Sequence, residues 1–267
     1  MSLIRKKFLE LKKNKKKALI IFMTAGDPSF KKNEELIGAF EKEGVDMIEL
    51  GVPFSDPLAD GPVIQASYQR SLARGTTLKK ILRLVRQVRH KTSLPLILMS
   101  SFNPVYHYGL KRFASDARAA GVDGLIIPDL PPEEGSETAL LMKKQRIDLI
   151  YLLAPTSSAA RQKTVARRSR GFVYYVSLTG VTGLRNTLSH GLAQQVRAVK
   201  KASPVPVCVG FGISKPDMAR KVAAMGDGII IGSAVVKALH SQRKLSAAAM
   251  AKKIIRPFAK ALGKKAR

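Results

Sequence analysis

Short apolar runs alternate with longer amphipathic segments along the whole chain. Eight of these runs have the length and aliphatic content of strands, and they lie at 18–24, 46–50, 95–100, 123–127, 148–153, 172–176, 205–209 and 227–231. Most are apolar at every position rather than at alternate positions, which is typical of parallel strands buried on both faces. The pattern therefore predicts a parallel sheet.

The segments between the runs carry apolar residues at helical spacing, at 32–43, 77–90, 133–146, 158–169, 190–202 and 214–224, and Gly44, Gly121 and Gly226 mark helix ends. Eight β-then-α units in about 250 residues indicate a (β/α)8 TIM barrel of the α/β class. We predict one single-domain barrel over 1–267. An extra amphipathic helix at 2–13 would cap its bottom, and a short extra helix would follow the eighth strand.

Composition narrows the class of protein. Hydrophobic residues make up 45% and charged residues 25%, which is ordinary globular usage. No apolar run approaches the ~18 residues that a membrane span needs, and the cationic start lacks the apolar stretch of a secretory signal. We therefore expect a cytoplasmic protein. Cys208, the one cysteine, lies in an apolar run and is predicted to be a buried packing residue.

The net charge is unusual. Lys and Arg number 47 against 19 Asp and Glu, which gives +28, and the excess gathers at both ends of the chain. Such a charge has two interpretations: binding to nucleic acid or a membrane surface, or a solvated coat on amphipathic helices. We favour the second interpretation, in which the charged side chains are solvated on the outer faces of amphipathic helices, because the sequence has no RNA-binding aromatic motif and no recognisable DNA-reading module.

In a TIM barrel the active site lies at the C-terminal ends of the strands. Glu49 lies in an apolar strand between Ile48 and Leu50, where desolvation raises a carboxyl pKa toward the range of a general acid/base. The alternative is a structural carboxylate bonded to backbone N–H groups. Asp60 follows on a Pro/Gly-rich loop, where an Asx turn or a helix cap is the alternative.

Glycine-rich turns follow three later strands. The run 177–186 is interpreted as a mobile lid or as an ordinary surface loop. The runs 210–214 and 232–239 present bare amides before a helix, which is the recurrent phosphate cradle of these barrels. Gly232 and Ser233 would open the short extra helix before a last long one.

The predicted strands contain no lysine, which disfavours a Schiff-base aldolase, and no group of Asp, Glu and His indicates a metal site. The residues alone therefore predict a barrel enzyme for a phosphorylated substrate, working by carboxylate acid/base catalysis without a metal or an organic cofactor.

Five of these runs together resemble a known family. ELGVPFSDPLADGPVIQ at 49–65, with 22–28, 175–183, 210–214 and 230–237, is similar to the α subunit of tryptophan synthase, over about residues 15–260. The run 49–65 is highly specific, whereas the glycine turns occur in many phosphate-binding barrels.

The resemblance implies a lyase that cleaves indole-3-glycerol phosphate to indole and glyceraldehyde 3-phosphate by a retro-aldol reaction. Glu49 matches the acid/base that moves the protons. Asp60 matches the carboxylate that faces the indole N–H and stabilises the positive charge formed when C3 is protonated. The other matching positions are Gly183, Gly212, Gly232 and Ser233 at the phosphate, Phe22, Tyr174 and Phe211 around the indole, and Thr182 on the lid.

The resemblance also implies a partner, a PLP-dependent β subunit in an α2β2 heterotetramer. The loop 53–60 and the turn 102–109 match the contact surface. The PLP belongs to the partner, so this chain is expected to hold no cofactor. Three alternatives remain open: another phosphate-binding barrel lyase or isomerase, a regulatory subunit that has lost turnover, and a non-specific nucleic-acid binder.

Overall fold

The computed structural model describes residues 1–57, 60–176, 190–210 and 212–266. Its strands form one parallel sheet in the order β5-β4-β3-β2-β1-β9-β8-β7-β6. They are β1 (Ala18–Thr24), β2 (Met47–Gly51), β3 (Leu96–Met99), β4 (Gly124–Ile126), β5 (Asp148–Ile150), β6 (Leu152–Leu153), β7 (Val173–Val176), β8 (Val207–Gly210) and β9 (Gly228–Ile231).

One predicted strand is split in two. The run 148–153 forms β5, which pairs with β4, and then β6, which pairs with β7. Between them the Tyr151 amide donates to the Ser169 hydroxyl at 3.3 Å rather than to a neighbouring strand. The run 148–153 therefore connects the two ends of the strand order, as the closure of a barrel requires. The predicted (β/α)8 barrel is confirmed.

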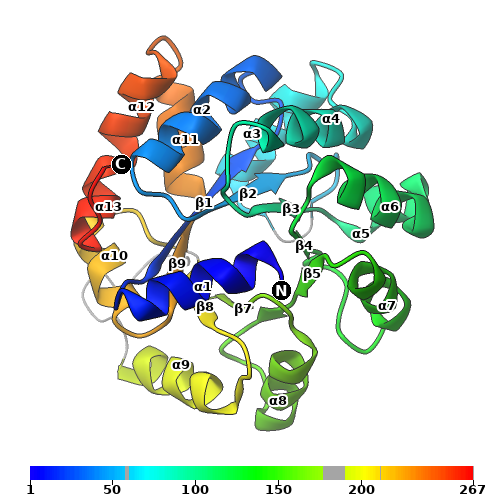
Figure 1. Cartoon of the computed structure of the whole chain (residues 1–267), viewed down its shortest axis with the longest axis vertical. Helices are drawn as coiled ribbons and strands as arrows, with labels where there is room; N and C mark the ends of the chain where they lie inside the picture. The colour runs from blue at the N-terminus through cyan, green and yellow to red at the C-terminus, as the bar shows by residue number, and fades with distance from the viewer. Residues whose placement is uncertain (58–59, 177–189, 211, 267) are drawn as a thin grey trace.

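Helices form a ring outside the strands, and α1 lies across one end of the barrel (Figure 1). They are α1 (Leu3–Lys13), α2 (Phe30–Lys42), α3 (Pro62–Leu72), α4 (Leu78–Arg89), α5 (Phe102–Tyr108), α6 (Leu110–Ala120), α7 (Ser136–Lys144), α8 (Ala159–Arg168), α9 (His190–Ala202), α10 (Pro216–Ala223), α11 (Ser233–Ser241), α12 (Ala247–Ile254) and α13 (Arg256–Ala261). None of these helices is long and apolar enough to cross a membrane.

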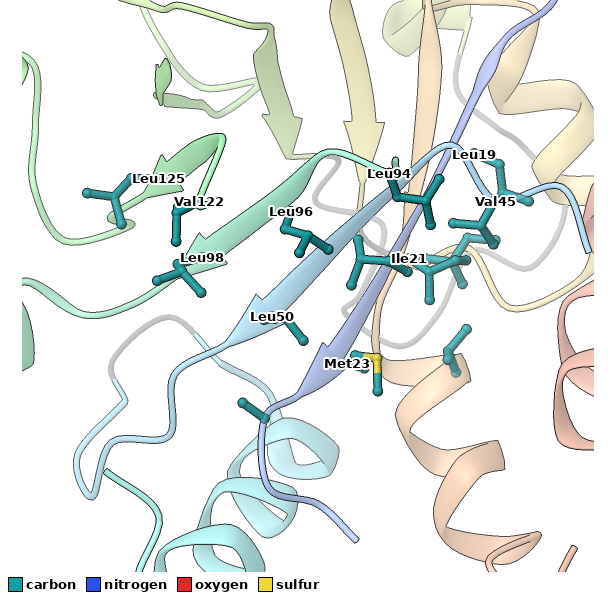
Figure 2. Close-up of a cluster of buried hydrophobic side chains, with 14 of the residues drawn as sticks. Leu19, Ile21, Met23, Val45, Leu50, Leu94, Leu96, Leu98, Val122 and Leu125 are labelled. Carbon is teal, nitrogen blue, oxygen red and sulfur yellow. The ribbon is translucent and has the colours of Figure 1, made fainter. Parts of the chain in front are cut away.

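The core has two layers. Along β1, Leu19, Ile21 and Met23 point outward into a layer beneath the helices (Figure 2), whereas Ile20 and Phe22 point into the barrel. Successive side chains of a strand face opposite sides, and both sides are buried here. This explains why most strand positions are apolar on both faces.

The N-terminal helix closes the bottom of the barrel, as predicted. Ile4, Phe8 and Leu11 of α1 are buried among the inward-facing strand residues. The Ser2 hydroxyl caps the helix by accepting from the Arg5 amide at 3.3 Å, and it donates to Asp148 at 2.5 Å. The apolar stripe and the cap together dock α1 on the strand N-termini.

Two local predictions are wrong. Residues 102–109, expected as a turn, form helix α5 ended by Gly109. The last long helix is two short ones, α12 and α13, because Pro257 stands in the first turn of α13 and lacks the amide that a continuous helix would use. The buried Cys208 and the short helix that begins at Ser233 are as expected.

Candidate active site

Glu49 points into the barrel near the C-terminal end of β2. Its neighbours in the sheet are Phe22 of β1 and Ile97 of β3, and it shares the inward face of β2 with Met47. The side chain is 0% exposed. A carboxyl group therefore lies among apolar side chains at the end of the barrel opposite α1.

The surroundings of Glu49 favour its neutral form. Neither carboxyl oxygen has a hydrogen-bond partner within the described part of the chain. Burial without such partners penalises the charged form and raises the pKa of Glu49 to about 8. At neutral pH Glu49 therefore carries a proton that it can donate, as expected for a general acid.

Asp60 lies just before α3, whose N-cap is Gly61. Its backbone oxygen accepts from the Gln65 side chain at 2.7 Å, while its own side chain is half-buried. Burial raises the pKa of Asp60 to about 6. At pH 7 Asp60 is therefore mostly ionised while Glu49 is mostly protonated, so the two carboxyl groups differ in charge.

Glu49 and Asp60 both influence two buried phenols. The pKa of Tyr174 on β7 lies well above its ordinary value because of burial, then the charges of Glu49 and Asp60. The pKa of Tyr68 on α3 is raised by burial, then by Asp60 and Glu49. Both rings belong to the inward-facing cluster of the barrel, and Asp60 lines a small cavity together with Tyr68.

Sequence reasoning missed Tyr68. It lies four residues after Ile64 on α3, and both side chains are buried in the barrel interior. A small cavity beside Tyr68 is lined by Asp60, Met99, Ser100, Ser101, Pro128 and Asp129. The one available signal was an aromatic residue at helical spacing after the acidic loop.

Glycines at two strand ends make room for the rings. A Cβ on Gly51 would lie 2.4 Å from Cζ of Phe22 and 3.0 Å from the Tyr68 hydroxyl oxygen, and one on Gly210 would lie 2.5 Å from the Tyr174 hydroxyl oxygen. Real atoms do not approach so closely. The mouth of the barrel is therefore shaped by rings packed over bare backbone.

The described part of the predicted phosphate cradle lies at the same end of the barrel. Gly232 follows β9 and opens α11, and its Cα faces Phe22, since a Cβ there would stand 3.6 Å from the Phe22 Cβ. The first-turn amides of a helix lack intrahelical acceptors and attract anions. Ser233 is exposed there, and Gly212 is exposed after β8 with a φ of 76°.

Other expected site residues lie outside the described residues: Thr182, Gly183, Phe211 and the whole of the predicted lid at 177–186. Within the described ranges, no three His, Cys, Asp or Glu side chains come together as a metal ion requires.

Comparison with known proteins adds independent evidence. Residues 8–263 match the model of the family described as tryptophan synthase alpha chain. A tryptophan synthase alpha chain from Geobacter sulfurreducens is 54% identical over 237 residues, covering 89% of this chain and 90% of that protein.

Solved structures agree in fold and sequence. A tryptophan synthase alpha chain from Legionella pneumophila superposes with a TM-score of 0.90 at 37% identity, covering 98% of both chains. A chain from a structure of the Pyrococcus furiosus tryptophan synthase α2β2 complex superposes with a TM-score of 0.85 at 35% identity, covering 92% of this chain and 99% of that one.

Proposed function

This chain belongs to the tryptophan synthase alpha chain family, and from that premise we propose which of its residues carry out the alpha reaction. The reaction cleaves indole-3-glycerol phosphate to indole and glyceraldehyde 3-phosphate, so the chain is a carbon–carbon lyase of tryptophan biosynthesis. The observation that carries the assignment is Glu49, a buried carboxyl group with a pKa of about 8 near an acid with a pKa of about 6.

Glu49 moves the protons of the retro-aldol step. Its carboxyl group gives a proton to C3 of the indole, and the bond between C3 and C3′ then breaks, returning its electron pair to the ring. The hydroxyl on C3′ loses its proton to the Glu49 carboxylate and becomes the aldehyde carbonyl of glyceraldehyde 3-phosphate. Glu49 ends protonated, so atoms and charge balance over one turnover.

Asp60 stabilises the positive charge that appears on the indole once C3 is protonated. An ionised carboxylate that accepts a hydrogen bond from the indole N–H does this in a site sheltered from water. The pKa of about 6 supports this role, because Asp60 is charged at the pH where Glu49 still holds its proton.

The remaining assignments divide between the two ends of the substrate. Phe22 and Tyr174 contact the indole ring together with Phe211, and Tyr68 closes the same wall. The phosphate binds to the amides near Gly183, Gly212, Gly232 and Ser233, and Thr182 reaches toward Asp60 when the lid closes. The position of Gly232 near Phe22 supports this division, since a Cβ on Gly232, at the start of α11, would stand 3.6 Å from the Phe22 Cβ.

The partner is a tryptophan synthase β subunit, with which the chain assembles as α2β2. The Pyrococcus furiosus assembly supports this. The loop 53–60 and residues 102–109 form the contact surface, and Tyr106 on α5 is 64% exposed there. PLP is held by that partner, and residues 1–267 of this chain act as a single domain without a cofactor of their own.

The test is an indole-release assay with indole-3-glycerol phosphate, with and without a β subunit. We expect weak activity alone, a rise with the partner, and loss of indole release in Glu49→Gln with β binding intact, because glutamine keeps the shape and lacks the proton. Glu35→Gln on the surface of α2 is the matched control. Near-normal turnover of Glu49→Gln would overturn the assignment, and an inactive wild-type chain that still activates the β subunit would favour a regulatory role.

A further inference from the structure

A second cavity lies at the end of the barrel opposite the active site. It is an open hollow with a volume of about 1390 Å³, lined by residues of α1, by 15–17 and by the turns at the N-terminal ends of the strands. Asp123, Asp148 and Asp227, at the starts of β4, β5 and β9, line it. Because the strands are parallel, this cavity is separated from Glu49 by the length of the barrel.

The lining of this cavity is strongly cationic. Eleven of its lining residues are Lys or Arg, and three are Asp. Each Asp is already engaged: Asp123 accepts from Arg89 at 2.7 Å, Asp148 from Ser2 at 2.5 Å and Asp227 from Lys200 at 2.7 Å. Asp227 thus pairs with one of the eleven cations, Lys200, and three carboxylates leave most of the positive charge of the lining unbalanced.

The surplus of positive charge is clearest at three lysines: Lys12, Lys16 and Lys143. All three line the cavity and are exposed, and within the described part of the chain none of them lies within 4.0 Å of a carboxylate. Deeper in, the Lys17 ammonium donates to the Gly226 carbonyl at 2.7 Å. Burial lowers the pKa of Lys17, and the charge of Lys200 lowers it further, while Asp227 acts in the opposite direction.

The shape of the cavity restricts its ligand. Its lining residues follow the whole length of α1 and continue through 15–17, so the hollow runs along this helix, and we call it the channel. The aromatic ring among the described lining residues is Phe8, which is 7% exposed. Single-stranded nucleic acids gain much of their affinity by stacking bases on exposed rings, and this channel offers none.

We propose that this channel binds a linear chain of linked phosphates, inorganic polyphosphate, along α1. Seven of the eleven cations are lysines, which attract phosphate as point charges without demanding a fixed geometry. A chain that carries charge on every unit and has no bases matches a cationic channel that follows α1 and offers no exposed ring. Because the site is at the bottom of the barrel, polyphosphate binds without blocking the active-site mouth.

The test measures binding of fluorescently labelled long-chain polyphosphate to the purified full chain by anisotropy, over a series of salt concentrations. The channel variant is Lys12→Glu with Lys16→Glu. The matched control is Lys79→Glu with Arg83→Glu on the exposed face of α4, which changes the net charge equally outside the channel. Circular dichroism verifies that both variants are folded.

We expect the channel variant to lose about tenfold or more in affinity at physiological salt and to reduce the salt slope by about 2, since each lost phosphate contact reduces it by roughly 1. The control should lose less than about twofold. Equal losses in both variants would overturn the proposal in favour of a diffuse charged coat. Tighter binding of single-stranded RNA, or binding of anionic lipid vesicles with none of polyphosphate, would also overturn it.

Discussion

Replacing Glu49 with glutamine should change how the stability of the protein depends on pH. The pKa of Glu49 is about 8 in the folded chain, against an ordinary value of 4.5. Between these values the folded state holds a proton that the unfolded state has released. The free energy of unfolding therefore falls as pH rises: the contribution is complete below pH 4.5 and is lost progressively up to about pH 8.

The size of this effect follows from the pKa difference. Each unit corresponds to roughly 1.4 kcal/mol, so a raised pKa of about 8 amounts to about 5 kcal/mol over the whole range. Between about pH 5.5 and about pH 7.5, the wild type should lose about 3 kcal/mol relative to Glu49→Gln. Glutamine does not titrate, so any fixed cost of burying its amide cancels from this difference.

The measurement is urea unfolding followed by far-ultraviolet circular dichroism, because the chain contains no tryptophan to report by fluorescence. Glu35→Gln, at an exposed position on α2, gives the baseline over the same pH range. The quantity compared is the free energy of unfolding of the wild type minus that of Glu49→Gln, which should fall as pH rises. If it changes with pH no more than the Glu35→Gln baseline, or if it rises with pH, then Glu49 is not a protonated acid in the folded chain and the reasoning is refuted.

Three further predictions concern activity and packing. The kcat/KM profile should be bell-shaped, with an acid limb near pH 6 where Asp60 must be ionised and a basic limb near pH 8 where Glu49 must be protonated; a rate that keeps rising above pH 9 would contradict the assigned states. Asp60→Asn should lower turnover by several orders of magnitude in the indole-release assay, since a neutral amide cannot stabilise the positive ring, and a loss below about tenfold would contradict its role. Gly51→Ala should cost about 1–3 kcal/mol in urea unfolding and raise KM, because its Cβ would lie 2.4 Å from Phe22, whereas Gly38→Ala, which has open space, should do neither.

The strands were predictable because both of their faces are buried. The run 18–24 is apolar at every position before Thr24 and is buried at every position in the structure. Glu49 was identified for the same reason, since a carboxyl group in such a run is an exception that calls for a chemical explanation. What the pattern could not show was the break at Tyr151, which depends on a hydroxyl 18 residues away.

The helix α3 could not be predicted from apolar spacing because its buried face is partly polar. Ser67 and Ser71 are both 0% exposed. The Ser67 hydroxyl shares a hydrogen bond of 2.6 Å with Thr24, and the Ser71 hydroxyl donates to the Ala25 carbonyl at 2.6 Å. Thr24 is the last residue of β1 and Ala25 follows it, far from α3 in the sequence. The local sequence of α3 therefore gives no sign of these hydrogen bonds. Missing α3 meant missing Tyr68, which this helix directs toward the two carboxyl groups.

The charge of +28 divides into two parts that differ in cause. In a TIM barrel the helices run antiparallel to the strands, so their last turns lie at the bottom, where cations offset the negative end of each helix dipole. Lys143 of α7 and Lys200 of α9 stand in such last turns, and the dipole gives them a structural reason. Lys15, Lys16 and Lys17 lie beyond the end of α1, in no helix, and line the bottom cavity. Of these three, Lys17 has a partner in the Gly226 carbonyl, whereas Lys15 and Lys16 stand beyond the last turn of α1, where the proposed anion would lie.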